Sequence, residues 1–403
     1  MGVDILILTH ILLHLQKYKK KKEKRLFFLQ KFGKLNKNIY FCKKNKTVNN
    51  YEYKVTIGFP VYNVEHYVYR SLESVLNQEF VSFEVIVVDD CGTDNSINVI
   101  KNIIDNHPNG EKVRIISHLK NKGLAEARNT AIKNAKGKYI YFLDSDDYIT
   151  PNALSTLYSA AEKYQADVVW GSNYKQREEK IWTENDDILP HRIFQKDGEF
   201  TSYLYSNLKD DLPNTAWNIL FSMDFLNRNN LEFPNIRFQE DIAFDEIYHP
   251  CIKKAVMLPD LTYYYLLRED SLMNVQSRES INTHEVDRSY ELCKLLKSNC
   301  KKWENDQIYG GICAKIMRRC FFQVAGILKH RNRFTSSVPD RVIRDMMKHP
   351  ASLLSIIRFK QLRKYNLFYY ILGILPPKVS VSVIFYICKK KGYLRLNSSK
   401  YTK

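Results

Sequence analysis

The chain has 403 residues, of which 44% are hydrophobic and 26% are charged, and its formal net charge is +18. This length suffices for one large or two ordinary domains with a sizeable core, and the composition is that of an ordinary globular protein. The eight cysteines include no C-x-x-C pair. We therefore expect neither a zinc site nor a redox motif, and free thiols in a reducing cytoplasm rather than a disulfide framework.

The positive charge is concentrated at the two ends of the chain. Residues 1–50 contain 13 Lys/Arg and 2 acidic residues, and residues 358–403 contain 11 Lys/Arg and no acidic residue. Residues 51–357 hold the remaining 38 basic and 42 acidic side chains, a net charge of −4. Basic arms can bind nucleic acid, but a near-neutral body without a recognisable nucleic-acid module indicates that nucleic acid is not a partner.

Each basic arm also carries an apolar segment. The segment "DILILTHILLHL" (4–15) is shorter than the roughly 20 residues that span a bilayer, and it lacks the cleavage site of a secretory signal. Residues 366–395 are interrupted by Pro376 and Pro377, which argues against a simple spanning helix. Both segments are typical of chain that lies on an anionic membrane surface, where each Lys or Arg adds roughly 1 kcal/mol. The alternatives are a disordered tail in front, from an over-extended translation start, and a core hairpin behind.

Short apolar runs alternate with helical stretches in the first half of the body. The apolar runs are residues 55–61, 83–88, 113–117, 139–143 and 167–171. Because they are continuous rather than alternating, they predict strands buried on both faces of a parallel sheet. Between them, residues 124–135 place Ala127, Ala131 and Ala135 on one helical face, and Thr150-Pro151 predicts another helix start. This succession predicts an α/β fold, an open doubly wound sheet that is mostly parallel.

Polar loops follow three of the predicted strands. Tyr62 and Asn63 follow the first, residues 89–96 the second, and Asp144, Asp146 and Asp147 the fourth. Ligands of open α/β sheets bind outside the carboxyl ends of the strands, so the three loops should meet at one crevice. Two carboxylates about 5 Å apart repel by roughly 3 kcal/mol at an effective dielectric near 20, so we expect a cation between them.

A divalent metal is the cation that this pattern favours. The chain has neither G-x-G-x-x-G after the first strand nor G-x-x-x-x-G-K-[ST], so it lacks the glycine loops that cradle phosphate. A site that holds phosphate without such a loop usually uses a metal, and oxygen-only ligands suit Mg²⁺ or Mn²⁺. Asp144 and Asp146 are therefore predicted to hold one of these ions as a bridge to a diphosphate.

Four segments together resemble glycosyltransferase family 2. They are "PVYNVEHYVYRSLESVLNQ" (60–78), "FEVIVVDDCGTDNS" (83–96), "NKGLAEARNTAIKNAKGKYIYFLDSDD" (121–147) and "FQEDIAF" (238–244). The resemblance is close over about 55–170 and looser to about 275. It implies a GT-A fold and an inverting transferase that moves a sugar from a nucleoside diphosphate to an acceptor hydroxyl.

The resemblance also assigns a donor site. The nucleotide base and ribose would contact Pro60, Tyr62, Asn63 and Glu65, and the edge of uracil would contact Asp89 with Asp90. Arg128 would lie at the diphosphate or its neighbouring acids, and Arg268 would lie at the diphosphate. Asp144 with Ser145 would contact ribose or metal, and Asp146 would bind the metal. "CG" at 91–92 replaces the commoner "GS", and Leu266 replaces the first arginine of a "YYYRxRxxS" pattern. Asp147 is assigned to local hydrogen bonding. UDP is favoured over other nucleotides only through Asp89.

The acceptor side rests on fewer residues. Inverting displacement needs a carboxylate opposite the leaving diphosphate to accept the proton of the acceptor hydroxyl. The resemblance assigns this base to Asp241, with Glu240 binding acceptor or orienting the loop, and it places Trp217 in the acceptor region. An ordinary acidic helix start and ordinary core packing of Trp217 are the alternatives.

The expected organisation is a basic arm (1–50), a GT-A domain (51–275, with halves 51–171 and 172–275) and a helical region with a membrane-associating tail (276–403). We expect a hexosyl- or N-acetylhexosaminyltransferase of cell-surface polysaccharide synthesis, peripheral on the cytoplasmic membrane face, with a saccharide or lipid-linked acceptor. A sugar-nucleotide nucleotidyltransferase would need a glycine-rich phosphate loop, which "FPVYNVE" lacks. A non-catalytic saccharide- or membrane-binding protein would need a missing motif acid, and all are present. The oligomeric state, the donor sugar and the linkage stay open.

Overall fold

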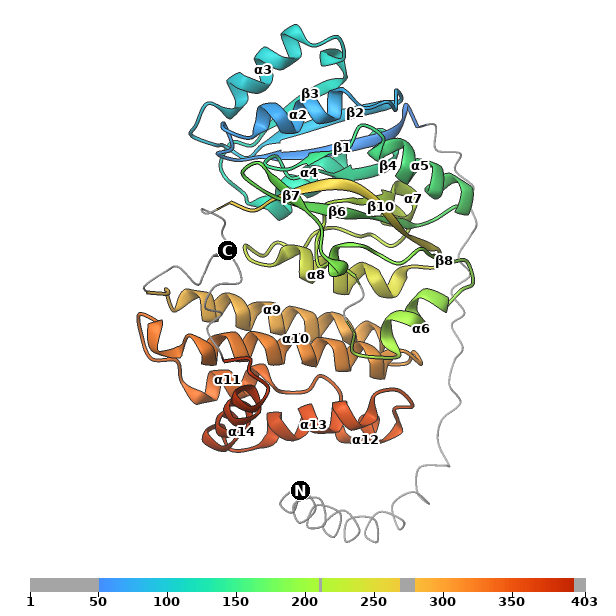
Figure 1. Ribbon diagram of the computed structural model, residues 1–403. Coiled ribbons are helices and arrows are strands. Elements are labelled where there is room, and N and C mark those ends of the chain that lie inside the picture. The colour runs from blue at the N-terminus through green and yellow to red at the C-terminus, as the bar shows by residue number, and fades with distance from the viewer. Residues whose placement is uncertain (1–50, 210–211, 269–279, 395–403) are drawn as a thin grey trace. The chain divides into compact units, whose positions relative to one another are not determined.

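The computed structural model describes residues 51–209, 212–268 and 280–394, and the sheet is the centre of this part. The N-terminal arm and residues 395–403 lie outside the described residues. The ten strands follow the order β3-β2-β1-β4-β9-β6-β10-β5, with β7 paired to β6 and β8 to β10 (Figure 1). Their bounds are β1 Tyr53–Val61, β2 Phe83–Asp89, β3 Val113–Ser117, β4 Gly137–Phe142, β5 Tyr148–Ile149, β6 Val168–Arg177, β7 Lys180–Trp182, β8 Arg192–Phe194, β9 Ile219–Ser222 and β10 Ala255–Leu266.

The five predicted strands are confirmed as β1, β2, β3, β4 and β6. β2, β1 and β4 are parallel neighbours, with Val55 opposite both Phe83 and Tyr139, and β3 extends the parallel part beyond β2. From β4 onward the sheet is mixed, because β9 is antiparallel to both β4 and β6. The predicted α/β sheet is thus present, and its parallel part carries the loops that were expected to form the site.

Helices cover both faces of the sheet. Their bounds are α2 Val68–Leu76, α3 Ser96–Asn106, α4 Leu124–Asn134, α5 Ala153–Tyr164, α6 Glu199–Tyr205, α7 Met223–Arg228, α8 Glu240–Tyr248, α9 His284–Cys300, α10 Tyr309–Lys329, α11 Asp340–Met346, α12 Leu353–Arg358, α13 Arg363–Ile374 and α14 Pro377–Lys390. The buried side chains of α2, α3 and α5 share one apolar cluster with the sheet, and those of α4, α7 and α8 share the other. Strands β1, β2 and β4 are therefore buried on both faces, as their continuous apolar runs require, whereas the edge strand β3 is only partly buried.

Close contact between α4 and the sheet explains one glycine of β1. A Cβ on Gly58 would lie 2.8 Å from the Phe142 ring of β4 and 3.1 Å from the Cβ of Ala131 on α4. The predicted small face of this helix is therefore in contact with the sheet. Ala127 and Ala131 are both buried there.

The predicted helix start at Thr150-Pro151 is wrong by two residues. Helix α5 begins at Ala153, and Asn152 occupies the position before it. Thr150 remains part of the sheet region, because its N–H donates to the Thr262 carbonyl at 3.0 Å and its own carbonyl accepts from Gln78 at 2.7 Å. These long-range bonds outweigh the local capping preference of a Thr-Pro pair.

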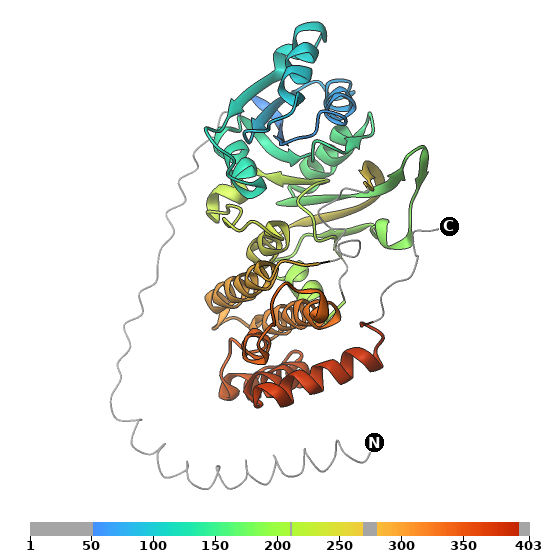
Figure 2. The same ribbon diagram turned by 90° about the vertical axis from the view of Figure 1, so that its left-hand side faces the viewer.

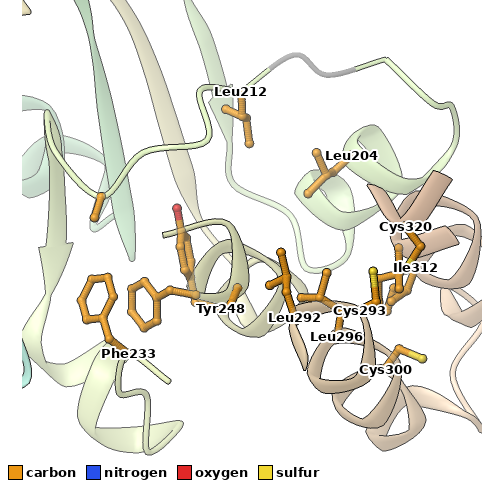
Figure 3. Close-up of a cluster of buried hydrophobic side chains, with 14 of the residues drawn as sticks. Leu204, Leu212, Phe233, Tyr248, Leu292, Cys293, Leu296, Cys300, Ile312 and Cys320 are labelled. Carbon is orange, nitrogen blue, oxygen red and sulfur yellow. The ribbon is translucent and has the colours of Figure 1, made fainter. Parts of the chain in front are cut away.

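The apolar cluster that contains side chains of α4, α7 and α8 continues from the sheet into the C-terminal helices. Figure 3 shows Phe233 and Tyr248 on the sheet side of this cluster and Leu292, Leu296 and Ile312 on α9 and α10. The two groups of side chains lie in one contiguous buried cluster. The C-terminal helices are therefore packed on the sheet through α8. The predicted boundary at 275/276 falls in a segment outside the described residues and stays a prediction.

The predicted break at the proline pair separates the last two helices. Helix α13 ends at Ile374, and Pro377 is the first residue of α14, where its missing N–H is harmless. Figures 1 and 2 show α12, α13 and α14 as the helices farthest from the sheet. Among the described residues, no helix combines the length and the apolar character needed to cross a membrane.

Candidate active site

Hydrogen bonds between the β1–α2 loop and the β2–α3 loop fix the first wall of the site. Asn63 Oδ1 accepts from the Thr93 N–H at 2.8 Å, and Glu65 Oε2 accepts from the Asn95 N–H at 2.9 Å. Asp94 in turn accepts from the Glu65 N–H at 2.8 Å. The side chains of Asn63 and Glu65 thus hold the two loops together in this structure. Their predicted contacts with the donor stay a prediction.

Asp90 anchors the loop that leads into α4. Its carboxylate accepts from the backbone N–H groups of Lys122 and Gly123, both at 2.8 Å, and lies 2.6 Å from His118 Nδ1. Gly123 has φ +91°, a conformation that favours glycine, and so its N–H can turn toward the acid. Asp89, the neighbouring residue, is less buried and accepts from the Cys91 N–H at 3.0 Å. The assignment of Asp89 and Asp90 to the base stays a prediction.

The turn after β4 brings three carboxylates to the same edge. Asp147 is buried and accepts from the Tyr263 hydroxyl at 2.6 Å and the Leu266 N–H at 2.7 Å, which is local hydrogen bonding of the predicted kind. Burial raises the pKa of Asp147 well above its usual range, and the charges of Asp146 and Asp144 act in the same direction. This residue therefore ties the turn to β10.

Two arginines neutralise the other two carboxylates. Arg268 forms an ion pair with Asp146, and its guanidinium lies 5.0 Å from the centre of the Tyr67 ring. Burial and the charge of Asp144 raise the pKa of Asp146, whereas Arg268 lowers it. Arg128 Nη2 lies 2.8 Å from Asp144 Oδ1. Each acid of this pair thus has an arginine beside it in the structure, and the predicted metal stays a prediction.

Arg128 connects this turn to the start of α8. It is 2% exposed, and its Nη1 donates to Glu240 Oε1 at 3.0 Å. Burial alone would lower the pKa of Arg128, but the charges of Asp144, Glu240 and Asp241 raise it. One buried guanidinium therefore fixes the turn after β4 and the first turn of α8 relative to each other.

Asp241 follows Glu240 in the first turn of α8. Its Oδ1 accepts from the Ile242 N–H at 2.8 Å. Burial and the charge of Glu240 raise the pKa of Asp241 to about 6. A carboxylate with this pKa is ionised at neutral pH and yet basic enough to accept a proton during a reaction.

A cavity of about 410 Å³ lies where these elements meet. Of the predicted site residues, those that line it are Pro60, Tyr62, Asp90, Asp144, Ser145, Asp146, Glu240 and Arg268. The predicted residues that do not line it are Asn63, Glu65, Asp89, Arg128, Trp217 and Asp241. Glu240 does line the cavity, Arg128 forms an ion pair with it, and Asp241 follows it directly in the chain. The structure therefore collects most of the predicted donor residues around one hollow at the carboxyl edge of β1 and β4.

Trp217 lies among aromatic side chains. Its ring stacks on Tyr263 at 4.5 Å and 13° and on Tyr265 at 5.3 Å and 14°. Tyr263 also donates to Asp147, so this stack borders the acidic turn. Packing of this kind gives Trp217 a structural role, and its contact with an acceptor stays a prediction.

Several residues around the cavity escaped the sequence analysis. Asn121, Leu124, Ile236 and Arg237 line it, and His118 supports Asp90 from behind. Arg237 precedes the acidic motif by three residues, so its position was a usable signal. His118 had no local signal, because its partner is 28 residues away in the chain.

Comparisons with known proteins identify the family. The sequence model described as Glycosyl transferase family 2 matches residues 56–226. Glycosyltransferase GlyG of Streptococcus pneumoniae serotype 4 (strain ATCC BAA-334 / TIGR4) is 30% identical over 233 residues, which are 55% of this chain and 73% of GlyG. The chain belongs to glycosyltransferase family 2.

Two further relatives show how far the similarity extends. The glycosyltransferase EpsJ of Bacillus subtilis (strain 168) is 31% identical over 231 residues, 57% of this chain and 66% of EpsJ. A crystal structure of residues 1–349 of TarS from Staphylococcus aureus, in complex with UDP, aligns with a TM-score of 0.59 at 18% identity, covering 86% of this chain and 94% of that one. The GT-A-like fold expected for the family is thereby confirmed. The alignments to the first three curated relatives span 66%, 32% and 33% of their lengths.

The acidic turn suits the metal that this family member was predicted to use. Asp144 and Asp146 offer only carboxylate oxygens, which hard divalent cations prefer, and both line the cavity. Among the described residues, no cluster of three or more His, Cys, Asp or Glu side chains could hold a metal by itself. Asp144 and Asp146 would therefore hold Mn²⁺ or Mg²⁺ together with water and ligand oxygens.

Proposed function

We propose that this chain is an inverting glycosyltransferase that transfers a sugar from a nucleoside diphosphate sugar, in the first place a UDP-sugar, to a hydroxyl of a saccharide or lipid-linked acceptor. The observation that carries the proposal is the cavity of about 410 Å³ that is lined by Asp144, Asp146, Arg268 and Glu240. Acids and an arginine at the carboxyl edge of an α/β sheet suit a metal-bound diphosphate. The UDP complex of the TarS structure supports the choice of nucleotide.

The chain's own residues can be given roles in such a transfer. A metal on Asp144 and Asp146 would neutralise negative charge that develops on the departing diphosphate. Arg268 and Arg128 lie beside the same acids and would add positive charge there. Asp241 would accept the proton of the acceptor hydroxyl, which its pKa of about 6 permits at neutral pH. Glu240, bound to Arg128, would keep the first turn of α8 in place.

The acceptor and the cellular site are finer points of the same proposal. Relatives with names such as poly(ribitol-phosphate) beta-glucosyltransferase favour an acceptor in cell-surface polymer synthesis. The basic, apolar helices α13 and α14 favour a peripheral position on the cytoplasmic membrane face, near acceptors anchored in the bilayer.

A thermal-shift panel of nucleotide sugars, each with and without Mn²⁺, tests the proposal. A ligand at 100 times its dissociation constant stabilises the folded state by about 2.7 kcal/mol, which raises the melting temperature measurably. We expect one UDP-sugar to stabilise the full chain only when Mn²⁺ is present, and Asp146→Ala to remove the shift. Asp197→Ala, which changes an acid away from the cavity, serves as the control. A panel that leaves the melting temperature of the parent unchanged would contradict the proposal.

A further inference from the structure

A second hollow lies among the helices farthest from the sheet. It measures about 410 Å³ and opens between α10, α13 and α14. The residues that line it are Leu208, Arg318, Phe321, Phe322, Lys364, Tyr365, Phe368, Tyr369, Ile387, Lys391 and Tyr393. We call this hollow the C-terminal groove. Its size is within the range of small-molecule sites, and eight of the eleven lining residues are aromatic or aliphatic, three of them tyrosines.

Aromatic side chains of the groove are accessible from outside. Tyr365 is 50% exposed, Tyr393 is 43% exposed and Phe322 is 38% exposed. Phe322 packs edge-on against Tyr393 at 5.4 Å, and the Arg318 guanidinium lies 4.9 Å from the Phe322 ring. Large apolar groups that remain open to solvent and form one hollow usually mark a binding surface.

The charge around the groove has a single sign. Three of its lining residues are cations, Arg318, Lys364 and Lys391, and none of the lining residues is acidic. In the part of the chain that the structure describes, neither Lys364 nor Lys391 has an ion-pair partner. The sequence extends this asymmetry, because residues 346–403 contain 12 Lys/Arg and no Asp or Glu. Such a surface favours an anionic ligand.

The outer faces of α13 and α14 carry more exposed apolar side chains. Ile374 is 61% exposed and Tyr386 is 65% exposed, and Val379 and Phe385 are also exposed. Lysines follow at the end of α14, from Lys389 to Lys391. Aromatic and aliphatic groups combined with lysines are the composition of helices that lie in the interface of a membrane.

We propose that the C-terminal groove binds one acyl or prenyl chain of an anionic phospholipid, with the lipid phosphate held by Lys364 and Lys391. An apolar slot with cations at its rim matches an amphiphile whose charge is next to its chain. The apolar outer faces of α13 and α14 would rest on the neighbouring lipids. This inference rests on the proposed function, because it names the surface through which the enzyme meets a membrane-bound acceptor.

Helix α10 connects this groove to the candidate active site. Arg318 and Phe322 of α10 line the groove, while Gln323 of the same helix donates to Gln239 at 2.5 Å. Gln239 immediately precedes Glu240 and Asp241. A lipid in the groove would therefore lie on the helix that also contacts the catalytic turn.

Vesicle sedimentation with the full chain tests the proposal. The probes are vesicles of phosphatidylcholine alone and vesicles that contain phosphatidylglycerol as well. The test variant is Lys364→Glu with Lys391→Glu, and the matched control is Lys294→Glu with Lys301→Glu, which reverses the same charge at a separate basic hollow beside α9. We expect the parent to bind the anionic vesicles and the groove variant to bind about 30-fold or more weakly, since each lysine at an anionic surface strengthens binding roughly fivefold.

Several outcomes of this experiment would overturn the proposal. An equal loss in the control variant would assign the binding to long-range charge rather than to the groove. Equal binding of the parent to both kinds of vesicle would mean that the net negative charge of the lipid is not recognised. A concentration-dependent dimer of the parent that the groove variant lacks, without vesicle binding, would assign the groove to a second copy of the chain.

A fluorescence measurement reports on the groove itself and does not depend on the charge variant folding. Phe322→Trp places an indole in the groove, and Tyr290→Trp places one on α9 as a control. Phosphatidylglycerol with bromine-labelled acyl chains should quench the indole at 322 well beyond the quenching seen in the parent. Quenching at 322 no greater than at 290 would contradict insertion of a chain.

The failure of this inference can be told apart from a failure of the proposed function. The donor-dependent thermal shift is measured on the same Lys364→Glu, Lys391→Glu protein, and we expect it to equal that of the parent. A normal donor shift without lipid-dependent quenching would reject only the groove. Lipid-dependent quenching without any donor shift in the parent would reject only the transferase proposal.

Discussion

In the Asp144-Ser145-Asp146 turn, Arg128 forms an ion pair with Asp144 and Arg268 forms one with Asp146. Without such cations, burial would make this pair of negative charges unfavourable, as the raised pKa of Asp146 indicates. A metal ion is positive, as the arginines are, so the metal and the arginines compete for the negative acids. A bound diphosphate is negative, so both the metal and the arginines attract it. The effect of an arginine should therefore depend on whether nucleotide is present.

The variant Arg268→Ala tests this competition. Without nucleotide, Mn²⁺ should bind the variant about threefold to tenfold more tightly than it binds the parent. In the parent, Mn²⁺ has to compete with a partly exposed ion pair on Asp146 that is worth roughly 1 kcal/mol, and the variant lacks this pair. With UDP present, Mn²⁺ should bind more weakly than to the parent, because the diphosphate has lost a cation. Calorimetric titration of Mn²⁺ with and without UDP measures both values. Arg237→Ala, an exposed arginine at the same cavity, is the control, and unchanged Mn²⁺ affinity in Arg268→Ala would refute the competition.

The raised pKa of Asp241 has a consequence for stability as well as for chemistry. Its folded-state value of about 6 exceeds the ordinary 3.8, so the folded chain binds this proton more tightly than the unfolded chain. The contribution of Asp241 to stability is therefore fully present below about pH 3.8 and is lost as the pH rises through about 6. A carboxylate that destabilises the fold at neutral pH suggests a position kept for function.

The sequence was sufficient to predict the acids but not their partners. Asp144, Asp146 and Asp241 occur in motifs whose spacing can be read directly, and Arg128 belongs to one of them. The contacts of Arg128 with Glu240 and of Asp147 with Tyr263 join residues 112 and 116 positions apart, for which the chain has no local signal. Which residues carry charge could thus be predicted, while which charges meet required the fold.

At the scale of elements, one ion-pair network joins α4, the turn after β4 and the start of α8. Arg128 of α4 is buried and contacts both Asp144 and Glu240. The side chains of those acids are 25% and 12% exposed, so they are only partly shielded from water. Removal of the arginine leaves two poorly solvated negative charges beside each other.

The variant Arg128→Met should therefore destabilise the fold. We expect the free energy of unfolding to fall by about 2 kcal/mol, below the 3–5 kcal/mol typical of fully buried pairs because the acids are partly exposed. Urea denaturation measures the change. Lys133→Met removes an exposed cation from the same helix, paired with Glu232 at 3.6 Å, and should cost less than about 0.5 kcal/mol. Mn²⁺ should restore more stability to Arg128→Met than it adds to the parent, and equal losses in both variants would contradict the network.

Strands were easier to predict than their order or the ends of helices. The five continuous apolar runs of the first half all became strands, since a buried strand needs a continuous run. Strand β9 lies between β4 and β6, and its position depends on pairing with residues far away in the sequence. Thr150 failed as a cap for a similar reason, because its backbone is paired with Thr262. Long-range pairing thus decided the features that local patterns missed.

At the scale of the whole described chain, the sheet and the C-terminal helices share one buried cluster, which Figure 3 shows around Tyr248 and Leu292. The sequence predicted basic, apolar helices at the C-terminus but not a groove, because the groove forms only when α10, α13 and α14 meet. Charge and hydropathy could therefore suggest the kind of surface. Its shape depended on tertiary packing.

The most direct test of the central claim compares turnover with donor binding in Asp241→Asn. With the UDP-sugar that stabilises the chain in the presence of Mn²⁺, the rate of sugar transfer to acceptor or water is measured from the UDP that is released, and donor affinity is measured by calorimetry. We predict that the substitution lowers the rate at least about 100-fold, as expected for loss of a general base, while the dissociation constant of the donor changes less than about threefold. The parent rate should rise with pH with a midpoint near 6, the pKa of Asp241, and the variant should lose this dependence. A variant that turns over at the parent rate would contradict the assignment of Asp241 and the mechanism built on it.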